Sequence, residues 1–291
     1  MKAILLAGGK GSRLYPVTLG VSKQLLPVYD KPMIYYPLSV LIMAKIKEIL
    51  LISSKEDINS YKRLLSDGTQ FGISIEYKVQ NKPNGLAEAF ILGEEFIGKD
   101  PVCLILGDNI FYGLDFTEKL EMVVKRTLSV GKGTIFSYPV NEPNRYGVIE
   151  YDKNGDVVSI VEKPRHPKSN NVVVGLYFYP NIVVKIAKKI RPSKRGELEI
   201  TSINEYFLKE RKLKVEALTH EFIWLDTGTL KSLIAAGQFI ETIEKRKGIK
   251  VGCLEELAYQ KGFINKKQLI QSISKMSETS YGNYLKNKYI K

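Results

Sequence analysis

The chain has 291 residues, of which 44% are hydrophobic and 26% charged, and its formal net charge is +13. This composition can build and cover an apolar core, which argues against disorder, and no apolar run is long enough to cross a membrane. The basic residues are scattered in short clusters and form no polybasic arm. We therefore expect a solvated basic surface and anionic substrates, with no nucleic acid and no membrane as partner.

Cysteine and histidine are scarce. Cys103 and Cys253 are far apart in the sequence, which predicts buried thiols in a reducing compartment and no disulfide. With only His166 and His220 besides, a zinc site is not expected, and both histidines are predicted at the surface. The first residues run straight into an apolar pattern without a leader-like segment, so we expect a cytoplasmic protein.

Strand-like and helix-like segments alternate over the first 110 residues. Apolar periodicity predicts strands at Lys2–Ala7, Glu48–Ser53, Ile73–Val79 and Val102–Leu106, and helices at Met33–Lys47, Glu56–Ser66 and Gly85–Ile97. Such alternation predicts an α/β fold with a mostly parallel, doubly wound, Rossmann-like sheet. Ligands of such sheets bind beyond the carboxyl ends of the strands.

The pattern becomes β-rich after a helix predicted at Asp115–Thr127. Strands are expected at Gly133–Val140, Gly147–Tyr151, Val157–Glu162, Val172–Tyr179, Lys214–Leu218 and Phe222–Leu225, and helices at Ile182–Lys189, Thr201–Lys209 and Leu230–Lys245. Short helices follow at Leu254–Gln260, Lys266–Ser274 and Gly282–Tyr289. We therefore expect one domain over residues 1–245, with halves 1–110 and 111–245, and a small helical C-terminal extension over 246–291.

The stretch Leu6–Leu14 carries the first chemical signal. Gly8, Gly9 and Gly11 follow the first strand, and Arg13 closes the loop. Glycines let backbone N–H groups approach an anion, and Arg13 offers a fork of donors for phosphate. Ser12 is expected to cap a following helix. The spacing fits neither a dinucleotide fingerprint nor a P-loop, so a nucleotide-phosphate cradle and a plain turn remain equally open here.

Two carboxylates and two lysines are further candidates. Asp108 and Asp226 each follow an apolar strand, and such a pair can hold Mg²⁺ together with substrate phosphates. Each alone is equally typical of an Asx-turn. Lys163, before Pro164, and Lys23 lie between apolar runs, although most lysines are solvated surface groups.

Several longer strings carry a family resemblance when taken together. They are Leu6–Leu14, Ser22–Pro37, Asn84–Ala87, Leu106–Asn109, Arg145–Val148, Glu162–Pro164, Gly175–Tyr179, Arg195–Thr201 and Trp224–Thr229. On these residues the chain resembles the sugar-phosphate nucleotidylyltransferases, most closely the short bacterial glucose-1-phosphate thymidylyltransferases. The resemblance runs from Lys2 to about Tyr284. It implies a nucleotidyltransferase fold whose β-rich second half binds the sugar phosphate.

The resemblance also implies a reaction and a set of site residues. dTTP and glucose 1-phosphate would give dTDP-glucose and pyrophosphate with Mg²⁺ as cofactor, the first step of dTDP-rhamnose or deoxysugar synthesis. The implied catalytic residues are Arg13, Lys23, Asp108 and Lys163, and the implied metal ligands are Asp108 and Asp226. The nucleotide would be bound by Leu6, Gly8, Gly9, Gly11, Ser12, Arg13, Gln24, Gln80, Gly85 and Asp108, and the sugar phosphate by Tyr146, Gly147, Glu162, Lys163, Val173 and Tyr177.

Relatives of this kind imply a homotetramer with a regulatory nucleotide site between subunits. Two alternatives remain open. A uridylyl- or cytidylyltransferase would share the fold, because one methyl group distinguishes thymine from uracil and is worth only about 1–3 kcal/mol in a pocket. A non-catalytic regulatory or nucleic-acid-binding protein on the same fold would be expected to have lost one of the charged residues, whereas Arg13, Asp108, Lys163 and Asp226 are all present.

Overall fold

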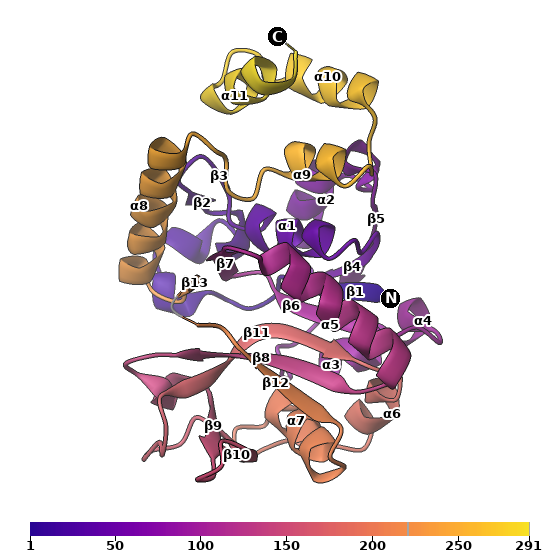
Figure 1. Cartoon of the computed structure of the whole chain (residues 1–291), viewed down its shortest axis with the longest axis vertical. Coiled ribbons are helices and arrows are strands. Elements are labelled where there is room, and N and C mark those ends of the chain that lie inside the picture. Colours follow the sequence, from indigo (N-terminus) through magenta and orange to yellow (C-terminus); the bar gives the residue numbers. More distant parts are fainter. Residues whose placement is uncertain (220, 291) are drawn as a thin grey trace.

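The computed structural model describes residues 1–219 and 221–290; the prediction for His220 lies outside them. A nine-stranded sheet runs through the molecule, with the core order β10-β9-β11-β6-β1-β4-β5 and with β8 and β12 branching from β11. Figure 1 shows helices on both faces of this sheet and further helices at the C-terminal end. The predicted α/β class with a helical extension is confirmed.

The first half forms the parallel part of the sheet. Its strands are β1 (Lys2–Leu6), β4 (Glu48–Ser53), β5 (Ser74–Val79) and β6 (Val102–Leu106), and all neighbouring pairs among them are parallel. The helices are α1 (Tyr35–Met43), α2 (Ile58–Leu65), α3 (Glu88–Leu92) and α4 (Glu94–Ile97). β1 and β6 are apolar because helices cover both of their faces. Their carboxyl ends therefore emerge together at one edge.

Two helix predictions in this half were too long. The segment predicted as one helix over Gly85–Ile97 divides into α3 and α4 at Gly93. A Cβ at Gly93 would lie 2.9 Å from the Ile4 side chain, so close packing on β1 requires glycine there. The helix predicted over Met33–Lys47 ends at Met43, and Lys45 has a φ of 58°, which no α-helix accommodates.

The second half extends the same sheet with mostly antiparallel strands. β11 (Asn171–Tyr179) pairs antiparallel with β6, β8 (Gly133–Pro139) and β9 (Gly147–Tyr151), and β10 (Val157–Glu162) pairs antiparallel with β9. β12 (Leu213–Ala217) is parallel to β8. The helices here are α5 (Phe116–Val130), α6 (Val183–Ala187) and α7 (Ile200–Lys209).

Two small ribbons lie beside the main sheet. β7 (Asn109–Gly113), which the sequence did not predict, pairs antiparallel with β13 (Phe222–Asp226), and β2 (Pro27–Val28) pairs with β3 (Lys31–Pro32). β7 follows β6 after a two-residue turn, so β13 is carried to the carboxyl edge of the parallel strands. Asp226, the last residue of β13, therefore reaches that edge on the two-stranded ribbon, whereas Asp108 lies in the turn between β6 and β7.

The C-terminal part is helical, as predicted. α8 (Leu230–Lys247) begins just after β13, and α9 (Leu254–Gln260), α10 (Lys266–Ser274) and α11 (Ser280–Tyr289) follow. α9 packs against α1, and the apolar residues of α9 to α11 share a core cluster with the α1 side of the sheet. Within residues 1–219 and 221–290, none of the helices has the length and apolar character that crossing a bilayer requires.

Candidate active site

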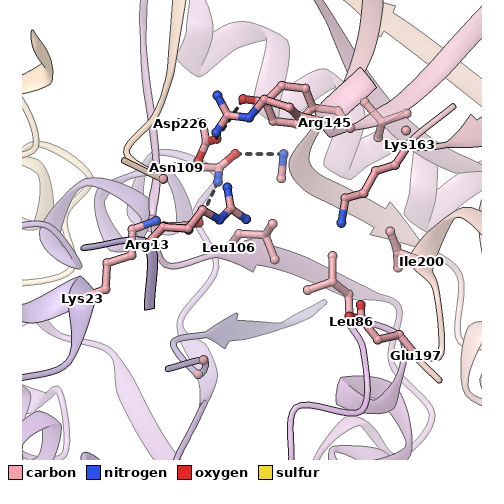
Figure 2. Close-up of a pocket in the computed structure, with 18 of the residues that line it drawn as sticks. Arg13, Lys23, Leu86, Leu106, Asn109, Arg145, Lys163, Glu197, Ile200 and Asp226 are labelled. Atoms are coloured by element: carbon pink, nitrogen blue, oxygen red, sulfur yellow. Dashed lines mark hydrogen bonds and ion pairs between the residues drawn. The ribbon is translucent and has the colours of Figure 1, made fainter. Parts of the chain in front are cut away.

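A cavity of about 390 Å³ opens at the carboxyl ends of β1 and β6, lined by residues from both halves of the chain. Most of the predicted site residues line it, although they come from all parts of the first 228 residues. They are Gly8, Gly9, Gly11, Ser12, Arg13, Lys23, Gln24, Asp108, Tyr146, Gly147, Glu162, Lys163, Val173, Tyr177 and Asp226. Figure 2 shows that charged side chains from both halves point into this one space.

Three predicted nucleotide-binding residues lie outside this lining. Leu6 is buried near the end of β1. Gln80 lines a second cavity, of about 490 Å³, which shares Gly8 and Gly9 with the first. Gly85 lines neither; its φ is 109° and a Cβ there would lie 2.4 Å from the Leu198 carbonyl oxygen. Close packing of Gly85 against the Leu198 backbone therefore explains why this position is a glycine.

The glycine loop forms a tight turn, and no α-helix begins there to contribute the positive end of a helix dipole. Gly11 has a φ of 58° and precedes a single 3₁₀ turn, Ser12–Leu14. The Ser12 side chain makes no capping bond and no α-helix follows, so the predicted helix N-cap is wrong. The Thr18 hydroxyl donates to the Gly11 carbonyl oxygen at 2.8 Å and closes the loop from behind. Any attraction for phosphate here comes from backbone N–H groups and Arg13.

Asp108 and Lys23 form a close ion pair at the floor of the cavity. Lys23 Nζ lies 2.6 Å from Asp108 Oδ2, and the Lys23 side chain is only 8% exposed. A buried ammonium requires such a partner, because an isolated charge in the interior is costly. Lys23 is therefore a structurally paired cation that lies beside the glycine loop, unlike the usual solvated lysine.

Asp226 is held on the same floor, next to Asp108. It pairs with Asn109 across β13 and β7, which places it beside Asp108. The Tyr146 hydroxyl donates to Asp226 Oδ2 at 2.8 Å, and Arg145 Nη2 lies 3.6 Å from the same oxygen. Burial first and the neighbouring Asp226 charge second raise the pKa of Tyr146, so this hydroxyl stays a donor at neutral pH.

Arg13 is directed toward this carboxylate from the glycine loop. A Cβ built on Gly228 would lie 3.4 Å from Arg13 Nη1 and 3.1 Å from Asp226 Oδ2. The guanidinium and the carboxylate therefore flank the same glycine. Gly228 leaves the space between them open, and a side chain there would intrude between the loop and the Asp226 carboxylate.

The carboxylates of Asp108 and Asp226 suit a hard divalent cation. They are oxygen ligands from adjacent positions on one floor, and Mg²⁺ commonly takes one or two carboxylates and completes its shell with phosphate oxygens and water. Among the described residues, no three His, Cys, Asp or Glu side chains gather closely enough to form a metal cage. The arrangement thus fits a cation shared with a phosphorylated ligand.

The far wall of the cavity is built around Glu162 and Lys163. Glu162 accepts a hydrogen bond from the Thr201 hydroxyl at 2.5 Å, and its other oxygen lies 3.5 Å from Lys163 Nζ and 3.7 Å from Arg195 Nη1. Lys163 has a φ of 42°, rare for a residue with a side chain. Figure 2 shows its ammonium pointing into the cavity.

Several lining residues received no role from the sequence. They are Leu14, Leu86, Leu106, Asn109, Arg145, Gly175, Glu197, Glu199, Ile200, Thr201, Trp224 and Gly228. All of them lie inside the strings that carry the family resemblance, which is the signal that could have found them. Burial raises the pKa of the Glu199 carboxyl, although the hydrogen bond from Ser193 opposes this shift.

Comparisons with known proteins agree with this geometry. Residues 2–243 match the family described as Nucleotidyl transferase. Curated glucose-1-phosphate thymidylyltransferases from Neisseria meningitidis and Mycobacterium tuberculosis are 53% and 50% identical to the chain over 285 residues, which is 98% of both chains in each case.

Solved structures show the same architecture. A proposed glucose-1-phosphate thymidylyltransferase from Bacillus anthracis, in complex with sucrose, superposes with a TM-score of 0.75 at 39% identity and covers 82% of this chain and 94% of its own. A UDP-glucose pyrophosphorylase bound to UDP-glucose has a TM-score of 0.71 at 24% identity, with coverage of 83% and 98%, which is a likeness of fold alone. The chain belongs to the Nucleotidyl transferase family and, within it, to the glucose-1-phosphate thymidylyltransferases.

Proposed function

We propose that the chain transfers the thymidylyl group of dTTP to glucose 1-phosphate, giving dTDP-glucose and pyrophosphate. The observation that carries this proposal is that Arg13, Lys23 and Lys163 line one cavity with Asp108 and Asp226. Three cations and two metal-ligating carboxylates suit two phosphorylated reactants. The curated relatives named for this reaction match the chain over nearly its whole length.

The reaction needs positioning more than proton transfer. A phosphate oxygen of glucose 1-phosphate forms a bond to the α-phosphorus of dTTP while the bond from that phosphorus to the bridging oxygen of pyrophosphate breaks. The nucleophile is already an anion at neutral pH, so no general base is required. Holding the two reactants in line and stabilising the charge that spreads over the phosphate oxygens supply the rate.

Each charged residue has a role in this scheme. Lys163, on the far wall, binds the phosphate of the sugar and aims its oxygen. Arg13, beside the glycine loop, stabilises the charge on the transferring and leaving phosphates, and Lys23 neutralises the same region from below. Asp108 and Asp226 would hold Mg²⁺, which neutralises charge on the triphosphate when it is bound.

The remaining predicted residues divide between the base and the sugar. Gln80 and Gly85 are assigned to the thymine ring, with Gln80 in the cavity that adjoins Gly8. Leu6, Gly9, Gly11, Ser12 and Gln24 complete the nucleotide side, and Tyr146, Gly147, Glu162, Val173 and Tyr177 surround the glucose. The Glu162 carboxylate and the Tyr146 hydroxyl suit sugar hydroxyls, which both donate and accept hydrogen bonds.

A broader assembly follows from the family. We propose a cytoplasmic homotetramer with a regulatory nucleotide site between subunits, whose product enters dTDP-rhamnose or deoxysugar synthesis. Residues 1–245 would form the nucleotidyltransferase domain, and residues 246–291 the helical extension that contributes to subunit contacts.

Pyrophosphate release tests the proposal directly. We expect release when the pure protein is mixed with dTTP, glucose 1-phosphate and Mg²⁺, and weaker turnover with UTP or CTP. Arg13→Ala and Asp226→Asn should each lower kcat about a hundredfold or more, the cost of one lost electrostatic contact. Arg63→Ala is the matched control, because Arg63 is an exposed arginine on α2 whose side chain donates to the Ser60 hydroxyl. Preference for UTP, or near-normal turnover in either site variant, would contradict the assignment.

A further inference from the structure

Asn109 occupies a position where four segments of the chain meet. It is the first residue of β7, directly after Asp108, and only 3% of its surface is exposed. It faces Asp226 across the β7–β13 ribbon, so both carboxylates of the cavity floor are its immediate neighbours. No role in the reaction was assigned to it from the sequence.

Both the oxygen and the nitrogen of the Asn109 carboxamide form hydrogen bonds, and the nitrogen uses one of its two protons. Its Oδ1 accepts the backbone N–H of Gly175 at 3.0 Å and the indole N–H of Trp224 at 2.7 Å. Its Nδ2 donates to Asp108 Oδ1 at 2.9 Å. The two accepted bonds come from β11 and β13, which fixes the plane of the amide and therefore the direction of the donated bond.

The space around the amide allows no other placement. A Cβ at Gly175 would lie 2.6 Å from Asn109 Oδ1. Only glycine at that position lets β11 come close enough for its N–H to reach the oxygen. Trp224 is itself held by the Tyr146 ring, packed edge to face at 5.3 Å between centroids.

These contacts fix the orientation of the Asp108 carboxylate. Its Oδ2 is bonded by Lys23 at 2.6 Å and its Oδ1 by Asn109 at 2.9 Å, so each oxygen has one donor from the protein. A carboxylate held at both oxygens cannot rotate, and the lone pairs that remain point in fixed directions. Partners that orient a metal ligand in this way are typically worth 10–100-fold in metal affinity.

We propose that Asn109 is a positioning residue that fixes the Asp108 carboxylate for the divalent cation, with Trp224 and Gly175 holding the amide in place. The inference rests on the proposed function, since it supposes that a cation binds with the nucleotide. It assigns Asn109 a role in cation affinity, and no part in bond making.

Asn109→Asp changes the bond to Asp108 and keeps the two accepted bonds. The substitution keeps an oxygen that accepts from Gly175 and Trp224, and it removes the amide donor to Asp108. It also adds negative charge beside the cation, which by Coulomb attraction alone would tighten cation binding. Loss of positioning weakens binding instead, so the two effects have opposite signs.

The chain provides a matched control. Asn204 on α7 is fully buried, accepts a hydrogen bond from the Tyr179 hydroxyl, and has no partner for its Nδ2 among the described residues. Asn204→Asp makes the same chemical change in a buried amide away from the carboxylates. It should leave cation affinity unchanged.

The experiment measures Mn²⁺ affinity without turnover. Mn²⁺ is titrated into the enzyme–dTTP complex without sugar phosphate, and the bound ion is followed by water-proton relaxation. We expect Asn109→Asp to weaken Mn²⁺ about 10–100-fold while Asn204→Asp matches wild type. Far-UV circular dichroism of metal-free Asn109→Asp should match that of wild type, because the accepted bonds that hold the side chain remain.

Several other results would overturn the proposal. Mn²⁺ affinity in Asn109→Asp within about twofold of wild type, or tighter, overturns the proposal, and so does equal weakening in Asn204→Asp. Should Asn109→Asp fail to fold, Trp224→Phe removes one of the two bonds that hold the amide, and unchanged Mn²⁺ affinity there overturns it instead. A protein that binds Mn²⁺ as expected but forms no dTDP-glucose refutes the proposed function and leaves this inference standing.

Discussion

A buried cluster of charged side chains joins the β2–β3 hairpin to the end of α8. Lys31 Nζ lies 2.5 Å from Asp30 Oδ1 and 2.9 Å from Glu244 Oε1, and the Lys31 and Glu244 side chains are only 2% and 3% exposed. Lys250 bonds the second oxygen of each carboxylate. Because α8 begins four residues after Asp226, the cluster holds the far end of the helix that follows the candidate metal ligand.

We expect Lys31→Met to lower the free energy of unfolding by about 3 kcal/mol. Removing one partner of a buried pair costs about 3–5 kcal/mol, because the remaining charge is left uncompensated. The lower end applies here because Glu244 keeps Lys250 at 2.7 Å and the Val251 amide at 2.9 Å. Adding Glu244→Gln should recover about 1 kcal/mol or more, as expected for coupled neighbours.

Urea denaturation, followed by far-UV circular dichroism and by Trp224 fluorescence, measures both variants. Lys245→Met is the control, because Lys245 forms an exposed pair with Glu241 at 2.6 Å on the same helix and such pairs contribute little. A loss in Lys31→Met no larger than in this control, or no recovery in the double variant, would refute the argument from burial.

Two further predictions use single positions of the same structure. Gly175→Ala should lower the free energy of unfolding by about 1–3 kcal/mol through overpacking and should also reduce kcat, because its Cβ would lie 2.6 Å from Asn109 Oδ1. Gly237→Ala in α8 should instead raise the free energy of unfolding by up to about 1 kcal/mol, because its Cβ would lie in ordinary contact, 3.5 Å from the Tyr29 amide nitrogen. Burial opposes ionisation of Asp30, but Lys31 and Lys250 outweigh it and lower its pKa. The stability that the charged Asp30 adds is therefore present at neutral pH and lost as pH falls below about 4, so unfolding free energies of wild type and Asp30→Asn should converge in acid.

Much of the site could be predicted because its residues stand at strand ends or in glycine-rich turns. Asp108 follows an apolar strand buried on both faces, and in a parallel sheet that alone places it at the ligand edge beside the glycine loop. The segments that carry the family resemblance then assigned Lys163 and the sugar-binding residues to the same site. The sequence could not show which side chains point into the cavity. Asn109 and Arg145 lie in the segments that carry the family resemblance, but only their contacts with Asp108 and Asp226 distinguish them from their neighbours.

The sequence by itself determined the α/β class, the positions of most strands and the family, because apolar periodicity and local strings are properties of neighbouring residues. It predicted an α-helix after Ser12, where one 3₁₀ turn forms, and one helix where Gly93 makes two, because packing against Thr18 and Ile4 overrides local propensity. Only the tertiary structure decided that β13 pairs with an unpredicted β7. That pairing joins residues more than a hundred positions apart, and no local pattern encodes which edge a distant strand will meet.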